Sequence, residues 1–329
     1  MKDRAIVISR RAAMGSALAL ALGACSSSGS SAKKSGDGGD LPKVSVGAIP
    51  VAEVAPLYLG IQKGFFRNHG LEVVAKQFQG GAAVVTGVIS GQAELGFSNI
   101  VSLLTARDRG VPLVSVIGAG TSTGDPQRDI NAIMVGPDST LKSAKDLVGK
   151  RVAINSWNSI GDTTVKTAVR KLGGDDWKIQ FVRVPHAQMP AQMAAGNVDA
   201  IWEAEPYRTM VLQAGGRILF DNLTETYPKV QIAQFFTTEQ TRRNKPQLVD
   251  SFVAGMKESQ TYAEAHTDEV RAVIKTYVKS LAPATAQTIV LPVWSPELDV
   301  QSALALGRAA HAYGTLTDAP DVSGLFGTA

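Results

Sequence analysis

Apolar and polar positions follow two periods along the chain from about residue 43 onward. Short runs of β-branched and aromatic residues predict buried strands, and the segments between them, with apolar residues every three to four positions, predict helices. The first unit has expected strands at 44–49, 71–78, 94–97 and 112–117, and expected helices at 56–66, 82–90 and 99–109. Strands and helices alternating at these lengths are typical of an α/β fold.

The same order of elements recurs after residue 150. Strands are expected at 151–155, 179–184 and 198–202, and helices at 161–171 and 189–195. The segments Gly91–Glu94 and Gly196–Asp199 also correspond, because each joins a glycine that ends a helix to an acidic turn residue before a buried strand. This weak repeat predicts two lobes of like topology.

The last third of the chain follows a different pattern. One more strand-like stretch lies at 231–236, and amphipathic helices are expected at 246–266 and 268–280. A helical segment after two α/β units predicts that the C-terminal part packs back onto the first lobe.

The first 25 residues have the composition of an export signal. A basic start is followed by an apolar run at 12–24, which is too short to span a hydrocarbon core of ~30 Å. The run ends in Leu22-Gly23-Ala24-Cys25, which resembles the lipobox of bacterial lipoproteins. We therefore expect removal of 1–24 as a signal peptide and lipidation of Cys25; a signal cleaved nearby without lipidation is the alternative. The Arg10-Arg11 pair leaves the general secretion and twin-arginine routes both open.

Removal of this signal changes the charge of the chain. It takes four of the 33 Lys and Arg residues and one of the 29 Asp and Glu residues, which leaves 29 basic and 28 acidic residues. No nucleic-acid partner is expected from so small a surplus. The segment 25–42 is rich in Ser and Gly and predicts a flexible tether.

Two local features are weak evidence for catalysis or metal binding. Gly120–Gly124 matches the G-x-S-x-G pattern of hydrolases, but a strand at 130–135 follows where that motif needs a helix, so a loop is expected. The four histidines have no spacing typical of metal ligands, and surface or loop positions are expected for them. Since Cys25 is the only cysteine, its lipidation would leave no thiol. No catalytic residue, metal or cofactor is expected.

Several motifs together resemble one family, the nitrate/sulfonate/taurine-type (thiamine-pyrimidine-precursor-like) substrate-binding proteins of ABC importers. The resemblance covers essentially all of 43–326. The motifs that carry it are Ala55–Gly60, Lys63–Phe66, Gly70–Val73, Ser90–Phe97, Ser143–Ala153 and Gly196–Ala200.

The resemblance implies an α/β type II periplasmic-binding protein fold, with two lobes that close on a small ligand. Each lobe would hold a mixed, mostly parallel sheet flanked by helices. Lobe one is expected at 43–125 and 236–329, and lobe two at 126–235, with crossovers near 117–129 and 231–236. The implied partners are a small-molecule ligand and the permease and ATPase subunits of an ABC importer. With the lipid anchor, we expect a monomer held at the extracytoplasmic face of the cell membrane.

Ligands of open α/β sheets bind beyond the carboxyl ends of the strands, at helix N-termini. Four loops satisfy this rule. Their candidate ligand-binding residues are Glu53, Ser98, Asn99, Ser156, Trp157, Asn158, Ser159, Glu203 and Glu205. Trp157 between small polar residues is suited to stacking on a ligand. Helix capping explains Asn99, Ser159 and Glu205 equally well, so both readings stay open.

The acidic candidates bear on the ligand. Glu53, Glu203 and Glu205 near one cleft would repel a sulfonate or nitrate, and no arginine obviously belongs there. If two of these acids face the cleft, a neutral, zwitterionic or amine-bearing ligand is expected, for example an aminopyrimidine-like heterocycle stacked on Trp157.

Two other functions are compatible with the same fold. One is an enzyme, either a pyrimidine-precursor synthase, whose cysteine-rich motif this chain lacks, or a dehydratase-like protein, for which no paired acid and base are evident. The other is a lipoprotein sensor that presents its ligand to a receptor. The sequence does not separate sensing from transport, and we expect a non-enzymatic receptor.

Overall fold

The computed structural model describes residues 41–327 of the chain. The predicted signal peptide, the lipidation site Cys25 and all of the tether before residue 41 lie outside the described residues. No helix within 41–327 is long and apolar enough to cross a membrane.

The first sheet is built from strands on both sides of the second predicted unit. Its order is β2 (Glu72–Gln77), β1 (Lys43–Ala48), β3 (Leu95–Asn99), β11 (Ala233–Thr238) and β4 (Leu113–Gly118). β1 pairs in parallel with β2 and β3, whereas β11 is antiparallel to both of its neighbours. The helices that connect these strands are α1 (Ala55–Lys63), α2 (Phe65–Asn68), α3 (Gly81–Ile89) and α4 (Ile100–Asp108).

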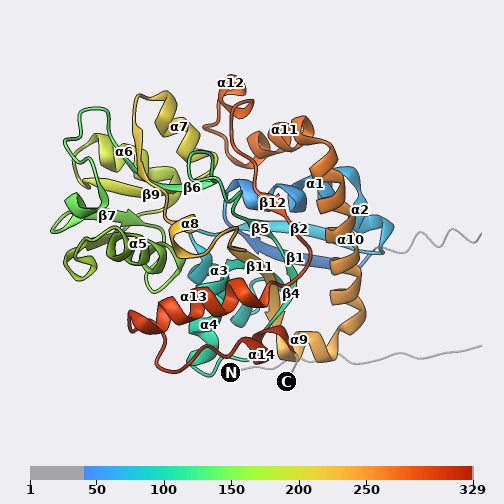
Figure 1. Cartoon of the computed structure of the whole chain (residues 1–329). Coiled ribbons are helices and arrows are strands. Elements are labelled where there is room, and N and C mark those ends of the chain that lie inside the picture. Colours follow the sequence, from blue (N-terminus) through green and yellow to red (C-terminus); the bar gives the residue numbers. More distant parts are fainter. Residues whose placement is uncertain (1–40, 328–329) are drawn as a thin grey trace, which may run out of the picture. The chain divides into compact units, whose positions relative to one another are not determined.

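The second sheet repeats this arrangement strand for strand. Its order is β8 (Gln180–Arg183), β7 (Arg151–Ile154), β9 (Ala200–Ala204), β6 (Asn131–Val135) and β10 (Arg217–Phe220), with β6 as the antiparallel strand. Its main helices are α5 (Ile160–Lys171), α6 (Met189–Ala194), α7 (Tyr207–Gln213) and α8 (Leu223–Thr226). In Figure 1 these elements lie together on the left, in green and yellow. The predicted two lobes of like topology are thus confirmed.

The chain crosses between the sheets twice. It leaves the first sheet after β4, passes through β5 (Gly120–Thr121) and returns between β10 and β11. β5 pairs with β12 (Val293–Trp294) in a small separate sheet. The predicted lobe boundary at 235/236 falls inside β11, which belongs to the first sheet over its whole length. The lobe ranges given above stay predictions.

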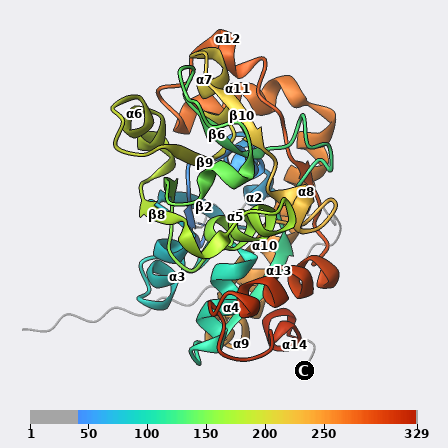
Figure 2. The same cartoon turned by 60° about the vertical axis from the view of Figure 1, so that its left-hand side comes forward.

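The C-terminal part is mainly helical and packs on the first lobe, as expected. It comprises α9 (Glu239–Asn244), α10 (Pro246–Ala265), α11 (Thr267–Tyr277), α12 (Pro283–Ala286), α13 (Val300–Ala312) and α14 (Val322–Phe326). α10 contacts α1 and α2, and α13 contacts α4 (Figures 1 and 2). α13 also contacts α5, so this segment touches both lobes.

Buried aromatic rings hold α10 against the first sheet. Phe235 of β11 contacts Phe97 of β3 and Phe252 of α10, with ring centroids 5.6 Å apart in both pairs. Phe252 also stacks on Phe66 of α2 at 5.5 Å. All four rings are almost fully buried, so helix and sheet share one close-packed core.

The G-x-S-x-G segment begins in the short strand β5 and is a loop only from Ser122 onward, without the helix that the motif needs. Ser122 is buried and donates a hydrogen bond to Asp129, and β6 follows instead of a helix. Ser122 therefore fixes the loop between the sheets and is not held on a strand-to-helix turn.

The internal repeat has a physical basis in two acidic side chains. Gly91 and Gly196 end their helices with φ of +74° and +71°, a backbone conformation that glycine adopts without strain. Glu94 then accepts a hydrogen bond from the backbone N–H of Ser45 at 2.9 Å. In the second lobe Asp199 accepts the equivalent bond from Arg151 at 2.8 Å. Each acid thus fixes the register of the strand that follows it.

We predict that Glu94→Ala and Asp199→Ala each lower the free energy of unfolding by about 1–2 kcal/mol, because each leaves a strand N–H without its carboxylate acceptor. Urea unfolding measures the change. Asp250→Ala is the control, since Asp250 is exposed and pairs only with Arg242 and should cost less than about 0.5 kcal/mol. Equal losses in all three variants would contradict the role of the two acids.

Candidate functional site

The two lobes contact each other directly near the carboxyl ends of their strands. The backbone N–H of Ala52 donates to the carbonyl oxygen of Glu205 at 2.8 Å. The N–H of Ile160, at the start of α5, donates to the side-chain oxygen of Asn99 at 3.3 Å. The first bond joins the segment after β1, in the first lobe, to the segment after β9, in the second. The other bond joins the start of α5, in the second lobe, to the end of β3, in the first.

A small cavity lies between the lobes at this contact. Its volume is about 20 Å³, which is room for about one water molecule. Both sheets contribute polar groups to its wall, and we call it the inner cavity. Its polar residues are Glu53, Asn99, Asn131, Asn155, His186 and Trp202.

Most of these groups stand at the strand ends that the topology brings together. Glu53 follows β1, Asn99 ends β3, Asn155 follows β7 and His186 follows β8. Asn131 is instead the first residue of the antiparallel strand β6, so its N-terminal end lies at this same edge of the sheet. Trp202 lies inside β9, with a side chain that reaches the cavity.

Several polar atoms of the inner cavity have no hydrogen-bond partner among residues 41–327. They are Oε2 of Glu53, Oδ1 of Asn131, Oδ1 of Asn155 and Nε1 of Trp202. Buried polar atoms are nearly always paired in native proteins, because an unpaired group forfeits its interaction with water. Three acceptors and one donor left in this state make the cavity a candidate site for a group with hydrogen-bond donors.

Glu53 is the only carboxylate in the wall of the inner cavity among the described residues. Its pKa is raised to about 7, chiefly by burial; a backbone hydrogen bond and His186 lower the pKa, and the nearby charges of Glu205 and Asp129 raise it. The carboxyl group therefore changes its charge near neutral pH, in the place where a ligand would contact it.

His186 and Glu203 form a buried pair beside the cavity. The Nδ1 atom of His186 lies 2.6 Å from Oε1 of Glu203, which also accepts from the N–H of Ala204 at 3.1 Å. Burial raises the pKa of Glu203, against the charge and hydrogen bond of His186 and the N–H of Ala204, which lower it. His186 is 4% exposed. A surface position is therefore wrong for this histidine, although it does lie in the connection that follows β8.

Glu205 is satisfied within its own lobe and its surroundings. Its carboxylate accepts from Thr209 Oγ1 at 2.8 Å, from Arg208 Nη1 at 3.3 Å and from the N–H of Val290 at 3.3 Å. Burial raises its pKa to about 7, and the bonds from Thr209 and the charge of Arg208 lower it. Glu205 does not line the inner cavity.

A larger pocket lies outside the inner cavity. It has a volume of about 490 Å³ and is lined by Asn155, Ser156, Trp157, Arg183 and Pro185 of the second lobe and by the loop and helix start at 79–83 of the first lobe. Asn155 lines both spaces, so we call this one the outer pocket. The side chain of Trp157 is 48% exposed at its rim.

The structure separates the predicted site residues into three groups. Glu53 and Asn99 line the inner cavity, and Ser156 and Trp157 line the outer pocket. Neither space is lined by Ser98, Asn158, Ser159, Glu203 or Glu205.

Helix capping accounts for several of these side chains. Ser159 forms a capping box with Asp162 at the start of α5, and the N–H of Asn158 bonds to the same carboxylate at 2.9 Å. Asn99 combines both readings, since it caps α4 through the N–H of Ser102 at 2.9 Å and lines the cavity.

Asn131, Asn155, His186 and Trp202 were missed by the sequence reasoning. Asn155 ends a predicted strand and His186 follows the next one, so the strand-end rule could have found both. Across residues 41–327, no cluster of three or more His, Cys, Asp and Glu residues is placed to hold a metal ion.

Two lobes, each with a mixed five-stranded sheet and joined by two crossovers, are the type II periplasmic-binding protein fold. The alkanesulfonate-binding protein of Xanthomonas axonopodis pv. citri, solved with bound MOPS, superposes with a TM-score of 0.73 at 20% identity, over 85% of this chain and 96% of that one. The family model described as NMT1/THI5 like matches residues 51–270. The chain belongs to this NMT1/THI5-like family.

Curated relatives differ in what their names say they bind. An Escherichia coli protein named for binding aliphatic sulfonates is 29% identical over 198 residues, which are 55% of this chain and 60% of that protein. The formylaminopyrimidine-binding protein of Halalkalibacterium halodurans is 26% identical over 145 residues, 44% of this chain and 42% of that protein. The matched stretch spans between 28% and 66% of the length of the curated relatives.

We predict that Glu53 makes the folded state less stable as pH rises. Its pKa is about 7 in the folded chain and ordinary, about 4.3, when unfolded. The folded chain therefore holds the proton more tightly, and this stability is present below about pH 4 and lost as pH rises through 7. Glu53→Gln should gain stability over wild type by on the order of 2 kcal/mol between about pH 5 and 8. Unfolding at several pH values measures the difference, and a constant difference would contradict the assignment.

A second prediction concerns the contact between the lobes at Gly80. A Cβ atom there would lie 2.5 Å from Oγ of Ser156 and 3.1 Å from the carbonyl oxygen of Asn155, both in the other lobe. Its φ of −178° is extended backbone that any residue adopts. Gly80→Val should therefore hold the lobes apart and increase the radius of gyration in small-angle scattering. Gly136→Val is the control, because no atom lies within 4 Å of a Cβ there. Identical scattering from both variants would refute this contact.

Proposed function

We propose that the chain is the extracytoplasmic solute-binding receptor of an ABC importer, which closes its two lobes on a small ligand and delivers it to a membrane permease with its ATPase. The family, the fold and the names of the relatives support this role. Lipidation of Cys25 at the lipobox-like sequence would hold the receptor at the membrane as a monomer.

The ligand that we propose is a small amine-bearing solute, for example an aminopyrimidine-like heterocycle. The observation that carries this proposal is the set of unpaired acceptors in the inner cavity, on Glu53, Asn131 and Asn155. A ligand amine or ring amino group donates hydrogen bonds to such acceptors. Trp202, Phe97 and His186 offer ring surfaces in the same wall for a planar ligand body.

The charges around the inner cavity support a cationic or neutral ligand over an anion. No lysine or arginine is among its lining residues. Asp129, Glu203 and Glu205 are fully buried nearby, and negative charge on Glu205 and Asp129 already raises the pKa of Glu53. A sulfonate or nitrate would add another negative charge to this environment, whereas a cation would relieve it.

Ligand entry requires a change in the distance between the lobes. The inner cavity has room for about one water molecule, which is too little for a heterocycle. The outer pocket, which Trp157 lines, shares the lining residue Asn155 with the inner cavity. We propose that the lobes open about the two crossovers, admit the ligand by this route and close on it.

We predict that aminopyrimidines bind and that taurine, alkanesulfonates and nitrate do not, as measured by calorimetric titration. Glu53→Gln, which keeps the size of the side chain, should weaken binding of the best cationic ligand by about tenfold or more, because a charge-assisted hydrogen bond is lost.

Glu72→Gln is the matched control, because Glu72 lies on β2 and lines neither the inner cavity nor the outer pocket. Tight binding of a simple sulfonate that Glu53→Gln leaves unchanged would refute the proposed ligand class. Turnover of a bound pyrimidine, followed by product analysis, would refute the receptor role in favour of an enzyme.

A further inference from the structure

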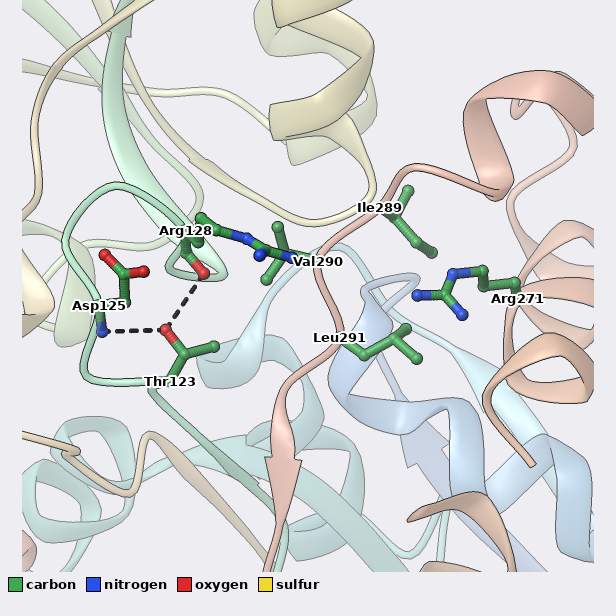
Figure 3. Close-up of a pocket in the computed structure, with 7 residues that line it drawn as sticks. All are labelled: Thr123, Asp125, Arg128, Arg271, Ile289, Val290 and Leu291. Carbon is green, nitrogen blue, oxygen red and sulfur yellow. Dashed lines mark hydrogen bonds between the residues drawn. The ribbon is translucent and has the colours of Figure 1, made fainter. Parts of the chain in front are cut away.

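A separate pocket lies where the chain crosses from the first sheet to the second (Figure 3). Its volume is about 260 Å³. One wall is the loop at 123–128, and the other is Arg271 of α11 with the apolar segment Ile289–Leu291. We call it the crossover pocket. It shares no lining residue with the inner cavity or the outer pocket.

Two arginine side chains of this pocket have N–H groups without an acceptor among the described residues. The Nε atom of Arg271 is buried and has no hydrogen-bond partner among residues 41–327. Its nearest acid is Asp268, at 3.6 Å from Nη1, and the Asp268 side chain is 90% exposed. The guanidinium group of Arg128 forms no hydrogen bond or ion pair with any described residue. By contrast, Arg208, in the same region, bonds to the carboxylate of Glu205 and to the carbonyl oxygen of Gln127.

The remaining groups of the pocket do not supply the missing acceptor. In Figure 3 the side chains of Arg128 and Arg271 extend toward each other from the two sides of Ile289–Leu291, and the carboxylate of Asp125 points away from both. That carboxylate instead accepts from the N–H of Gln127 at 3.0 Å. Two guanidinium groups beside an apolar wall therefore face one pocket, and guanidinium is the group best suited to bind a carboxylate.

We propose that the crossover pocket binds a small organic carboxylate. Its oxygens accept hydrogen bonds from Arg128 and Arg271, and its short apolar body packs on Ile289–Leu291. This site differs from the inner cavity in position and in charge. It takes an anion, whereas the inner cavity favours a neutral or cationic ligand that donates hydrogen bonds. It does not depend on the proposed importer function.

The pocket is connected to the contact between the lobes. The N–H of Val290, in its apolar wall, donates to Oε1 of Glu205 at 3.3 Å. The loop wall is tied to α7 by the bond from Arg208 to Gln127 at 3.1 Å. A carboxylate that joins Arg128 to Arg271 thus links the crossover loop to the C-terminal segment, and we expect it to stabilise the folded chain by mass action.

Butyrate is the probe for this proposal, and n-butylamine, with the same chain and the opposite charge, is its comparator. We expect butyrate to bind saturably to the purified protein in calorimetric or NMR titration and to raise the melting temperature, and butylamine to do neither at this site. Arg128→Gln and Arg271→Gln should each weaken butyrate binding by about tenfold, because each removes a charge-assisted hydrogen bond.

Arg308→Gln is the matched control, because Arg308 is exposed on α13 and lines none of the three spaces. Its affinity for butyrate should equal that of wild type. Arg128 lies in an exposed part of the loop, so Arg128→Gln tests the site even if Arg271→Gln does not fold. Three results would overturn the proposal. One is an Arg128→Gln variant that binds butyrate as tightly as wild type, and another is wild-type protein that butyrate does not saturate by ~10 mM. The third is an Arg308→Gln variant that loses as much butyrate affinity as Arg128→Gln.

Discussion

Burial of carboxylates at the contact between the two lobes is the constraint on which the site depends. Glu53, Glu203 and Glu205 are each at most 4% exposed, and taking a charged group out of water is costly unless it is paired. Glu205 is compensated by Thr209 and Arg208, and Glu203 is compensated in part, because its Oε1 pairs with His186. Glu53 and Glu203 each keep Oε2 without a partner among the described residues, so part of the cost falls on the wall of the inner cavity and part on the buried pair beside it.

The repeated topology explains why this cost arises at that place. In each lobe four strands run in one direction and one crossover strand, β11 or β6, runs in the other. The carboxyl ends of the four strands therefore face the other lobe, and their loops bring polar side chains to one contact. The helix starts there need caps, which Asn99 and Ser159 supply. The same types of polar residue, at the same positions, therefore serve both to cap helices and to line the cavity.

The sequence predicted much of this arrangement, and its omissions have physical reasons. Alternating periods located most strands and helices of both lobes, and the strand-end rule found Glu53 and Asn99. It could not find Asn131, because an antiparallel strand presents its first residue at the edge where parallel strands present their last. Trp202 was missed because an aromatic residue within a strand reads as core. The pairing of His186 with Glu203 joins the connection after β8 to a residue inside β9, and these two strands are not neighbours in the sheet, so no local spacing encodes it.

The unpaired oxygen of Glu53 also suggests how a ligand could drive closure. In the proposed closure the lobes would bury this carboxyl group, whose pKa is raised by burial in the structure described, so closure without a ligand would cost free energy whenever the group is ionised. A cationic donor placed between the lobes reverses the sign of that contribution, because it favours the ionised form in the closed state. The open state, in which Glu53 would meet water, gains less from the same ligand. A ligand shifts an equilibrium only by its differential affinity for the two states, and one buried acid in the cavity wall supplies such a difference.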